Sequence, residues 1–142
     1  MHVTGFMTPA TKVFSCFDDS PIDRALTLML NEKISSVVVI NRENQAVGIV
    51  TKTDLASSYH RGIDLQQPVS QIMSSELYTV RETDSRDTVA DLFQKKHINH
   101  AVVLNNEGIF VGLVSSWDVA AECARDAKAW PWIRSDDGRI HA

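Results

Sequence analysis

The hydrophobic and polar positions of this chain follow one pattern that occurs twice. The pattern is an aliphatic run, a polar turn and a second apolar stretch, at 37–40, 41–44 and 47–50 and again at 101–104, 105–108 and 111–114. Aliphatic runs of this length are typical of strands that are buried on both faces. Polar turn residues between two such runs predict a hairpin. We therefore predict two equivalent β-hairpins.

Each predicted hairpin lies between two predicted helices. Short extended segments at 13–17 and 77–80 come first. In the first copy, Ser20 is a suitable helix N-cap, Pro21 suits the first helical position, and an apolar stripe follows. In the second copy, the helix is expected to start near Asp84 or Ser85. The later helices are expected at about 53–59 and 117–128, so each copy has the order β-α-β-β-α.

The two copies form an internal repeat. An offset of 64 residues aligns 20–55 with 84–119 without a gap, and the offset changes by two before residue 13. The chain accordingly divides into repeat 1, repeat 2 and a C-terminal extension, at 1–62, 63–126 and 127–142. A half of about fifty residues is too small to bury a good core alone. The predicted fold class is therefore α/β (α+β), with the two repeats packed face to face in pseudo-two-fold symmetry.

Composition and charge exclude several classes of function. The net charge is −4, and no basic run is longer than Lys95-Lys96, which argues against a nucleic-acid partner. No window approaches 18 apolar residues, so no membrane span is expected. Cys16 and Cys123 form no CxxC pair, and the five histidines form no HxH or HExxH cluster, so no metal site is expected. No spacing suggests a catalytic group, and the expected location is the cytoplasm or an organelle stroma.

One motif ends the second apolar stretch of each copy. Residues 47–54 and 111–118 share Val-Gly, two aliphatic residues, a hydroxyl residue, two variable positions and an aspartate. Thr51 and Ser115 fall where the strand runs into the helix, and Asp54 and Asp118 lie three residues later. These groups can act as helix caps. They can also line a site for a ligand that carries paired hydroxyls and a negative group, and the pattern leaves both interpretations open.

The chain resembles a tandem pair of CBS (cystathionine-β-synthase-type) domains, also called a Bateman module. The resemblance covers nearly everything from residue 3 to about 125, through the repeated element order, the segments 34–39 and 98–103, and above all the two Gly-h-h-[Thr/Ser]-x-x-Asp motifs. The family often has proline where Val38 and Val102 stand. Valine suits a strand better than proline does, so this departure costs little.

The resemblance implies ligand binding in two clefts between the repeats. The implied ligands are AMP, ADP or ATP, with or without Mg²⁺. S-adenosylmethionine, NAD and cyclic dinucleotides are secondary candidates. By position, Asp54 and Asp118 would accept hydrogen bonds from the ribose hydroxyls. Thr51 and Ser115 would lie near the phosphate and the helix start. A carboxylate has enough acceptor sites for a vicinal diol, and helix amides favour a phosphate.

The resemblance also suggests where the remaining parts of the ligand lie. Adenine would be held by the first extended segment and a nearby apolar side chain of each repeat, with Ser15, Ile34, Thr79 and Ile98 as candidates. His100 would contact the phosphate, and Lys52 is a further candidate. The residue that matches His100 in repeat 1 is the uncharged Ser36. The two sites are therefore expected to be unequal, with the phosphate in the cleft that His100 lines.

The expected function is regulatory rather than enzymatic. A stand-alone sensor of this kind would form a disc-like homodimer through the helices that follow the motifs, and it would modulate an unidentified partner protein. The alternative is a nucleotide-independent interaction scaffold, or a modulator of a redox or metabolic enzyme. That alternative would use Trp130 and Trp132 as a contact surface, because tryptophan is enriched at interfaces. Equally, these two side chains can cover the outside of the module.

Overall fold

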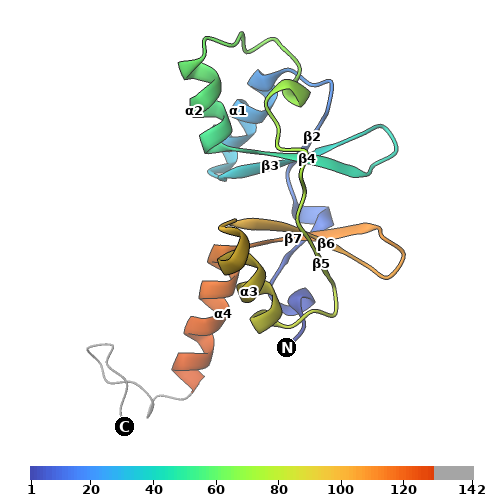
Figure 1. The fold of residues 1–142 in the computed structure, drawn as a ribbon, viewed down its shortest axis with the longest axis vertical. Coiled ribbons are helices and arrows are strands. Elements are labelled where there is room, and N and C mark those ends of the chain that lie inside the picture. Colours follow the sequence, from blue (N-terminus) through green and yellow to red (C-terminus); the bar gives the residue numbers. More distant parts are fainter. Residues whose placement is uncertain (130–142) are drawn as a thin grey trace, which may run out of the picture.

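The two repeats form two halves of the molecule, stacked along its longest axis (Figure 1). The structure is a computed structural model that describes residues 1–129, and side chains as far as residue 126. The Trp130 and Trp132 segment lies outside the described residues. In each half the helices cover the outer face of a sheet, and the two sheets lie between the helix layers (Figure 1). This arrangement confirms the α+β class and the face-to-face packing of two repeats.

Both repeats have the predicted order of elements. Repeat 1 contains β2 (Ser15–Phe17), α1 (Ile22–Glu32), β3 (Ser36–Ile40), β4 (Ala46–Thr51) and α2 (Lys52–His60). Repeat 2 contains β5 (Thr79–Arg81), α3 (Arg86–Lys96), β6 (His100–Leu104), β7 (Phe110–Ser115) and α4 (Ser116–Ala129). Three short 3-10 helices, η1 (Val3–Gly5), η2 (Ala10–Lys12) and η3 (Val69–Gln71), and the strand β1 (Thr8–Pro9) complete the described chain. None of the described helices combines the length and the apolar character needed to span a bilayer.

The strand pairings repeat with the same register. β3 and β4 are antiparallel with Ser36 opposite Thr51, and β6 and β7 are antiparallel with His100 opposite Ser115. β2 runs parallel to β3, and β5 runs parallel to β6. The hairpin turns include Asn44 and Gly108 with φ of 61° and 78°, the left-handed region that these residue types tolerate best. The predicted hairpins are confirmed, because turn chemistry and strand pattern favour the same register.

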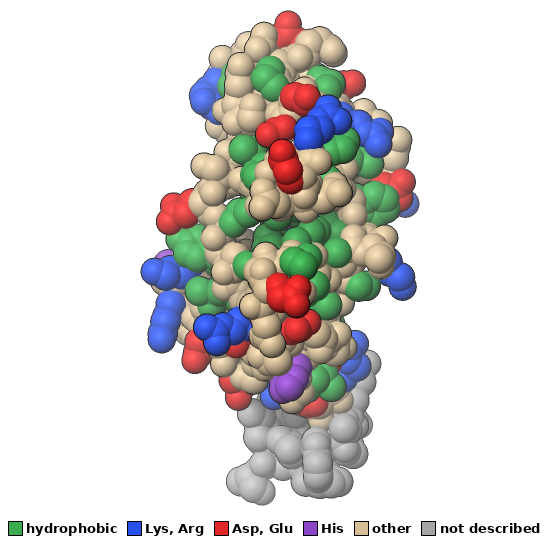
Figure 2. All heavy atoms as spheres, turned by 90° about the vertical axis from the view of Figure 1, so that its right-hand side faces the viewer, with side chains coloured by type: hydrophobic (Ala, Val, Ile, Leu, Met, Phe, Trp, Pro, Cys, Tyr) green, Lys and Arg blue, Asp and Glu red, His purple; other side chains and the backbone are tan. Residues whose placement is uncertain are grey.

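The central strands are buried on both faces, as the aliphatic runs predict. In β3, Val37 and Val39 belong to a core beneath the helices, together with Ile22 and Met29 of α1. Val38 is fully buried but belongs to neither helix-side core. Because side chains alternate along a strand, Val38 faces the other half of the molecule. Figure 2 views the molecule from the side of the hairpin turns and shows hydrophobic side chains gathered at mid-height, where the halves meet.

The segment before each repeat packs on the opposite half of the molecule. Val3 and Phe6 are buried in the repeat 2 core, and Val69 and Ile72 are buried in the repeat 1 core. The N-terminus accordingly lies beside the repeat 2 helices (Figure 1). Residues 1–12 belong to repeat 1 by their place in the sequence, yet Val3, Phe6 and Met7 pack in the core of repeat 2. The alignment of the two repeats does not reveal this exchange. The repeat spacing is the same whether each segment packs on its own half or on the opposite half.

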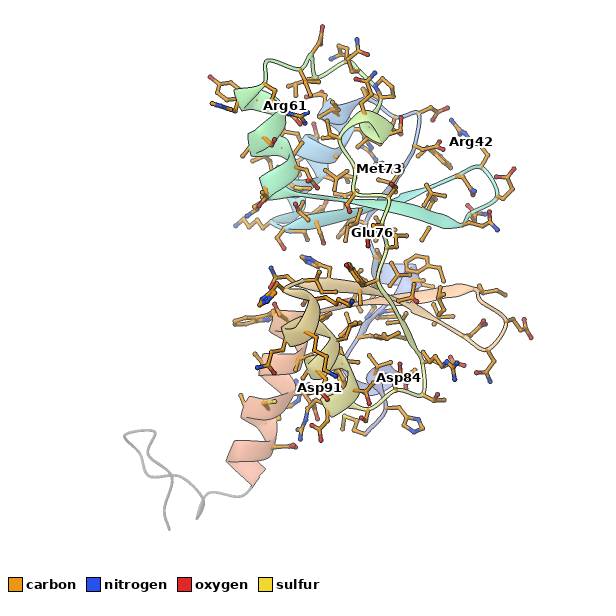
Figure 3. The ribbon with its side chains drawn as sticks, in the orientation of Figure 1. Arg42, Arg61, Met73, Glu76, Asp84 and Asp91 are labelled. Atoms are coloured by element: carbon orange, nitrogen blue, oxygen red, sulfur yellow. The ribbon has the colours of Figure 1, made fainter. Side chains whose placement is uncertain are left out.

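The motif glycines lie where the exchanged segments cross the sheets. A Cβ atom on Gly112 would meet the carbonyl oxygen of Thr8 at 2.8 Å and the side chain of Met7. A Cβ atom on Gly48 would meet the carbonyl oxygen of Ser74 at 3.1 Å and the side chain of Met73, which Figure 3 labels beside β4. Both glycines therefore allow close packing of a neighbouring backbone.

The start of α1 differs from the sequence prediction. The helix begins at Ile22 with Pro21 as its N-cap, and Ser20 does not cap it. Instead, the Ser20 hydroxyl accepts a hydrogen bond from the Phe17 amide at 3.1 Å. Backbone carbonyls of the inter-repeat linker satisfy the Ile22 and Asp23 amides, so no side-chain cap is needed. At α3 the prediction is confirmed, because Ser85 accepts a hydrogen bond from the Thr88 amide.

Candidate functional site

The first motif forms a capping box at the junction of β4 and α2. The Asp54 amide donates to the Thr51 hydroxyl at 3.3 Å. In return, the Asp54 carboxylate oxygen Oδ2 accepts from the Thr51 amide at 2.8 Å and from the Thr51 hydroxyl at 3.2 Å. A hydroxyl residue and an aspartate three positions later satisfy two otherwise unpaired amides of a helix start. Thr51 and Asp54 therefore do cap α2, as the first interpretation of the motif predicts.

The second motif has the same geometry at the junction of β7 and α4. The Asp118 amide donates to the Ser115 hydroxyl at 3.1 Å. Asp118 Oδ2 accepts from the Ser115 amide at 2.8 Å and from the Ser115 hydroxyl at 3.0 Å. The repeat is thus preserved at the level of single hydrogen bonds.

Capping uses one oxygen of each carboxylate. All the hydrogen bonds that the side-chain carboxylates of Asp54 and Asp118 accept within the described part of the chain go to Oδ2. Both side chains are half-buried, and each lines a cleft. The second oxygen, Oδ1, therefore keeps its acceptor sites for another group. A cap and a ligand contact are compatible in the same residue, and the two interpretations of the motif do not compete.

Asp54 lies in a cleft of about 500 Å³ between the two halves, which we call the first cleft. Thr51, Lys52 and Asp54 come from repeat 1. The facing wall comes from the start of repeat 2 and from the entry to β6. That wall consists of Glu76, Leu77, Tyr78, Ile98, Asn99, His100, Ala101 and Val102. The first cleft therefore combines the carboxylate of one repeat with a wall of the other repeat in which apolar side chains, such as Leu77 and Ile98, lie beside polar ones.

Asp118 lies in the pseudo-symmetric second cleft, of about 430 Å³. Ser115, Trp117 and Asp118 come from repeat 2, and the facing wall comes from repeat 1. That wall includes Lys12, Val13, Phe14, Lys33, Ile34, Ser35 and Ser36. The sequence predicts residues of both walls but does not indicate which aspartate faces which wall. The packing of the two halves pairs each aspartate with the wall of the other repeat.

Most of the predicted site residues lie in these clefts. Ile98 lines the first cleft, Ile34 the second, and Lys52 and His100 line both. Ser15 and Thr79 are the first residues of β2 and β5 and are not among the residues that line either cleft. The residues before them in the same predicted segments, Phe14 and Tyr78, line the clefts. The sequence thus located the strand entry to within one residue, and the alternation of side chains decided which residue faces inward.

His100 is a shared wall of the two clefts. Its backbone pairs with Ser115 across β6 and β7, and its half-buried side chain lines both sites. Burial lowers the pKa of the His100 imidazole below its usual value, while the nearby Asp118 carboxylate partly opposes this effect. His100 was expected to mark one cleft as the phosphate site. Because it faces both clefts, it does not distinguish them.

Several lining residues were not named from the sequence. Lys12 and Lys33 line the second cleft, Glu76 lines the first, and Trp117 lines both with 78% of its surface exposed. Figure 3 shows Glu76 on the chain segment that passes between the two sheets. A signal for Lys12 and Glu76 exists in the alignment, because they directly precede the matched Val13 and Leu77. Within the described chain, no group of three or more potential metal ligands comes together.

Comparison with known proteins places this geometry among proteins of one family. The CBS domain family model matches residues 3–61 and 69–125. Inosine-5′-monophosphate dehydrogenase of Aquifex aeolicus is 32% identical over 102 residues, which are 71% of this chain and 20% of that protein. Homoserine O-acetyltransferase of Methanococcus vannielii is 26% identical over 111 residues, which are 77% of this chain and 23% of that protein. The chain thus spans about a fifth to a quarter of these curated relatives.

Solved structures agree with the fold. CBSX2 in complex with AMP superimposes with a TM-score of 0.79 at 21% identity, covering 88% of this chain and 97% of that one. The CBS domain of a bacterial CNNM/CorC family Mg²⁺ transporter in complex with ATP superimposes with a TM-score of 0.78 at 25% identity. The latter match covers 87% of each chain.

Proposed function

Because the chain belongs to the CBS domain family, we propose that it is a non-catalytic regulatory module that binds adenosine compounds, with AMP, ADP and ATP foremost, in its inter-repeat clefts. The observation that carries this proposal is the arrangement of Asp54 and Asp118. Each lines a cleft, keeps one carboxylate oxygen free of the cap, and faces a wall that carries apolar side chains. A nucleoside needs both features, because its ribose diol donates hydrogen bonds and its base stacks on apolar groups.

The proposed pose assigns one part of the ligand to each wall. Oδ1 of Asp54 or Asp118 accepts from the ribose hydroxyls while Oδ2 keeps the cap. The base lies against Tyr78 and Ile98 in the first cleft, or against Phe14 and Ile34 in the second. The phosphate then extends past the motif hydroxyl towards the helix start, where backbone amides favour negative charge. Ligand binding in this pose holds the two repeats together.

Two further facts support a nucleotide as the ligand. Volumes of about 500 and 430 Å³ lie within the range of roughly 300–1,000 Å³ that small-molecule sites occupy. The CNNM/CorC transporter CBS domain, at 25% identity over 87% of this chain, is a protein solved with ATP. AMP, ADP and ATP are therefore the leading ligands, with Mg²⁺ as an available counter-ion for the longer phosphate chains.

We infer that regulation, rather than catalysis, is the output. Among the described side chains, the motif hydroxyls bond to their own aspartates and none bonds to a histidine that could act as a general base. A ligand that contacts both repeats can shift how they pack, and a partner protein or a second copy can read that shift. Tyr59 on α2 and Trp117 on α4 are 88% and 78% exposed, which supports an interface along the helices that follow the motifs.

Calorimetry combined with native mass spectrometry tests the proposal. The purified chain is titrated with AMP, ADP and ATP, and its mass with and without ligand gives the number bound and the oligomeric state. Binding is expected for the wild type and a loss of about tenfold or more for the Asp54→Asn, Asp118→Asn double variant, because asparagine can keep the cap but loses the charged acceptor. No binding at millimolar nucleotide, or wild-type affinity in the double variant, contradicts the proposal.

A further inference from the structure

The two clefts share their geometry but differ in the charge of their side chains. Lys12 and Lys33 line the second cleft, where Asp118 is the only carboxylate among the lining residues described. The first cleft has neither of these lysines and contains two carboxylates, Asp54 and Glu76. Lys52 lines both clefts, so it adds the same charge to each and does not alter the comparison. The second cleft therefore has an excess of positive charge, and the first has an excess of negative charge.

Neighbouring groups do not remove this difference. The ion pairs among residues 1–126 involve other side chains and leave Lys12, Lys33 and Glu76 without an oppositely charged partner. The Tyr78 hydroxyl approaches Glu76 Oε1 at 3.5 Å, which is too long for a strong hydrogen bond. All three charged side chains are exposed, so they can turn towards a ligand without leaving water.

The charge is reversed at equivalent positions of the repeat. Lys12 ends η2 directly before Val13, and Glu76 directly precedes Leu77. Each charged residue therefore stands at the start of the segment that forms the apolar wall of its own cleft. Lys33 adds to the second cleft because it is the C-cap of α1, with φ of 54°. The matching C-cap of α3 is His97, which is not a lining residue of the first cleft.

Resting on the proposed function, we propose that the two clefts bind different chemical classes of adenosine compound. The second cleft takes the nucleotide that carries a phosphate, because its lysines attract the phosphate and supply hydrogen-bond donors. The first cleft takes an adenosine compound whose 5′ substituent is uncharged or positively charged, because Glu76 repels a phosphate and attracts a cation. The chain then reports on two ligands rather than on two copies of one.

Three probes separate these classes: AMP, adenosine and S-adenosylmethionine, each titrated into the full chain by calorimetry. AMP and adenosine differ only in the phosphate, and S-adenosylmethionine carries a sulfonium cation. The wild type is expected to bind one AMP, and Asp118→Asn is expected to weaken that binding while Asp54→Asn leaves it intact. Raising the ionic strength is expected to weaken AMP more than adenosine, because salt screens exposed charges.

Charge variants then test the assigned residues. Lys12→Gln with Lys33→Gln should lower AMP affinity by about tenfold or more and adenosine affinity by less than about twofold. The matched control is Lys95→Gln with Lys96→Gln, which removes the same charge from exposed positions on α3 outside both clefts. Glu76→Gln should raise the number of AMP molecules bound from one to two, and it should weaken S-adenosylmethionine binding.

The outcomes distinguish this inference from the function on which it rests. If the wild type binds none of the three probes and neither ADP nor ATP, the proposed function fails and the inference fails with it. If the probes bind but the Lys12 and Lys33 double variant keeps its AMP affinity, only the charge assignment is overturned. The same holds if Asp54→Asn, rather than Asp118→Asn, removes the AMP site.

Discussion

At the residue scale, the two aspartates show that one side chain can cap a helix and still face a ligand. Oδ2 of Asp54 and of Asp118 is committed to the hydroxyl residue three positions earlier, and Oδ1 is directed at no described donor. The cap also fixes the rotamer of the carboxylate. A side chain held in place before the ligand arrives loses less conformational entropy on binding, so the capping box would strengthen the proposed ribose contact.

His100 is expected to make the stability of the fold depend on pH. Burial lowers the pKa of the folded His100 below the ordinary 6.5. Just below pH 6.5 the unfolded chain therefore binds more protons at this residue than the folded chain does. The contribution of His100 to stability is present above that pH and is lost as the pH falls through the window. Urea unfolding of the unliganded protein at pH 5.5 and 7.5 should show a smaller pH-dependent loss of stability for His100→Gln than for the wild type.

The other residues that titrate are the same in both proteins, so the difference between them isolates His100. An equal loss of stability in the wild type and in His100→Gln would contradict a pKa lowered by burial. The direction of the pH effect is what distinguishes the two causes. If attraction to the Asp118 carboxylate dominated, it would raise the pKa of His100, and the residue would stabilise the fold at low pH.

At the element scale, the motif glycines couple each hairpin to the exchanged segment that crosses it. Gly112→Ala is expected to lower the free energy of unfolding by about 1–3 kcal/mol, because the new Cβ would force the Thr8 carbonyl and β1 to move. Gly48→Ala should cost less, since the Ser74 carbonyl lies further away, at 3.1 Å. Urea unfolding curves provide the measurement.

A second substitution separates side-chain crowding from backbone crowding. Met73→Ala should rescue part of the Gly48→Ala defect, because the flexible end of Met73 is one of the two obstacles. Met7→Ala should rescue Gly112→Ala poorly, since the Thr8 backbone stays in place. Full rescue by Met7→Ala would show that the carbonyl contact does not limit this position.

At the scale of the whole molecule, each half depends on a segment that belongs by sequence to the other half. Phe6→Ala and Ile72→Ala each remove a buried side chain and should cost about 2–5 kcal/mol. Phe6→Ala is expected to lower hydrogen-exchange protection in α3 more than in α1, and Ile72→Ala in α1 more than in α3. The two variants serve as controls for each other. Loss of protection in the helix nearer in sequence would contradict the exchanged packing.

The exchanged segments also link the packing of each half to the lining of a cleft. Residues of each crossing segment pack under one half and then line a cleft: Met7 contacts Gly112, and Lys12 lies beside the second cleft a few residues later. Met73 and Glu76 have the corresponding relation to Gly48 and the first cleft. A ligand that draws in a crossing segment therefore acts on the packing of the opposite repeat, which supports a regulatory output.

Local patterns in the amino-acid sequence were enough to predict the features that depend on neighbouring residues. The 64-residue repeat, the order of elements and the two hairpins follow from aliphatic runs and turn residues, and the Thr51 and Ser115 junctions follow from capping chemistry. These features involve residues close together in the chain, so spacing alone is informative. The Ser20 cap was wrong because distant linker carbonyls satisfy the amides of α1.

Which groups meet across the molecule depends on how the two halves pack together. It paired Asp54 with the repeat 2 wall, placed His100 between both clefts and distributed Lys12 and Glu76 to different sites. Two similar halves can exchange segments or keep them without any change in the repeat pattern. The choice depends on which buried surfaces fit each other, and those surfaces join residues far apart in the chain. For that reason the charge difference between the clefts became visible only once the halves were packed together.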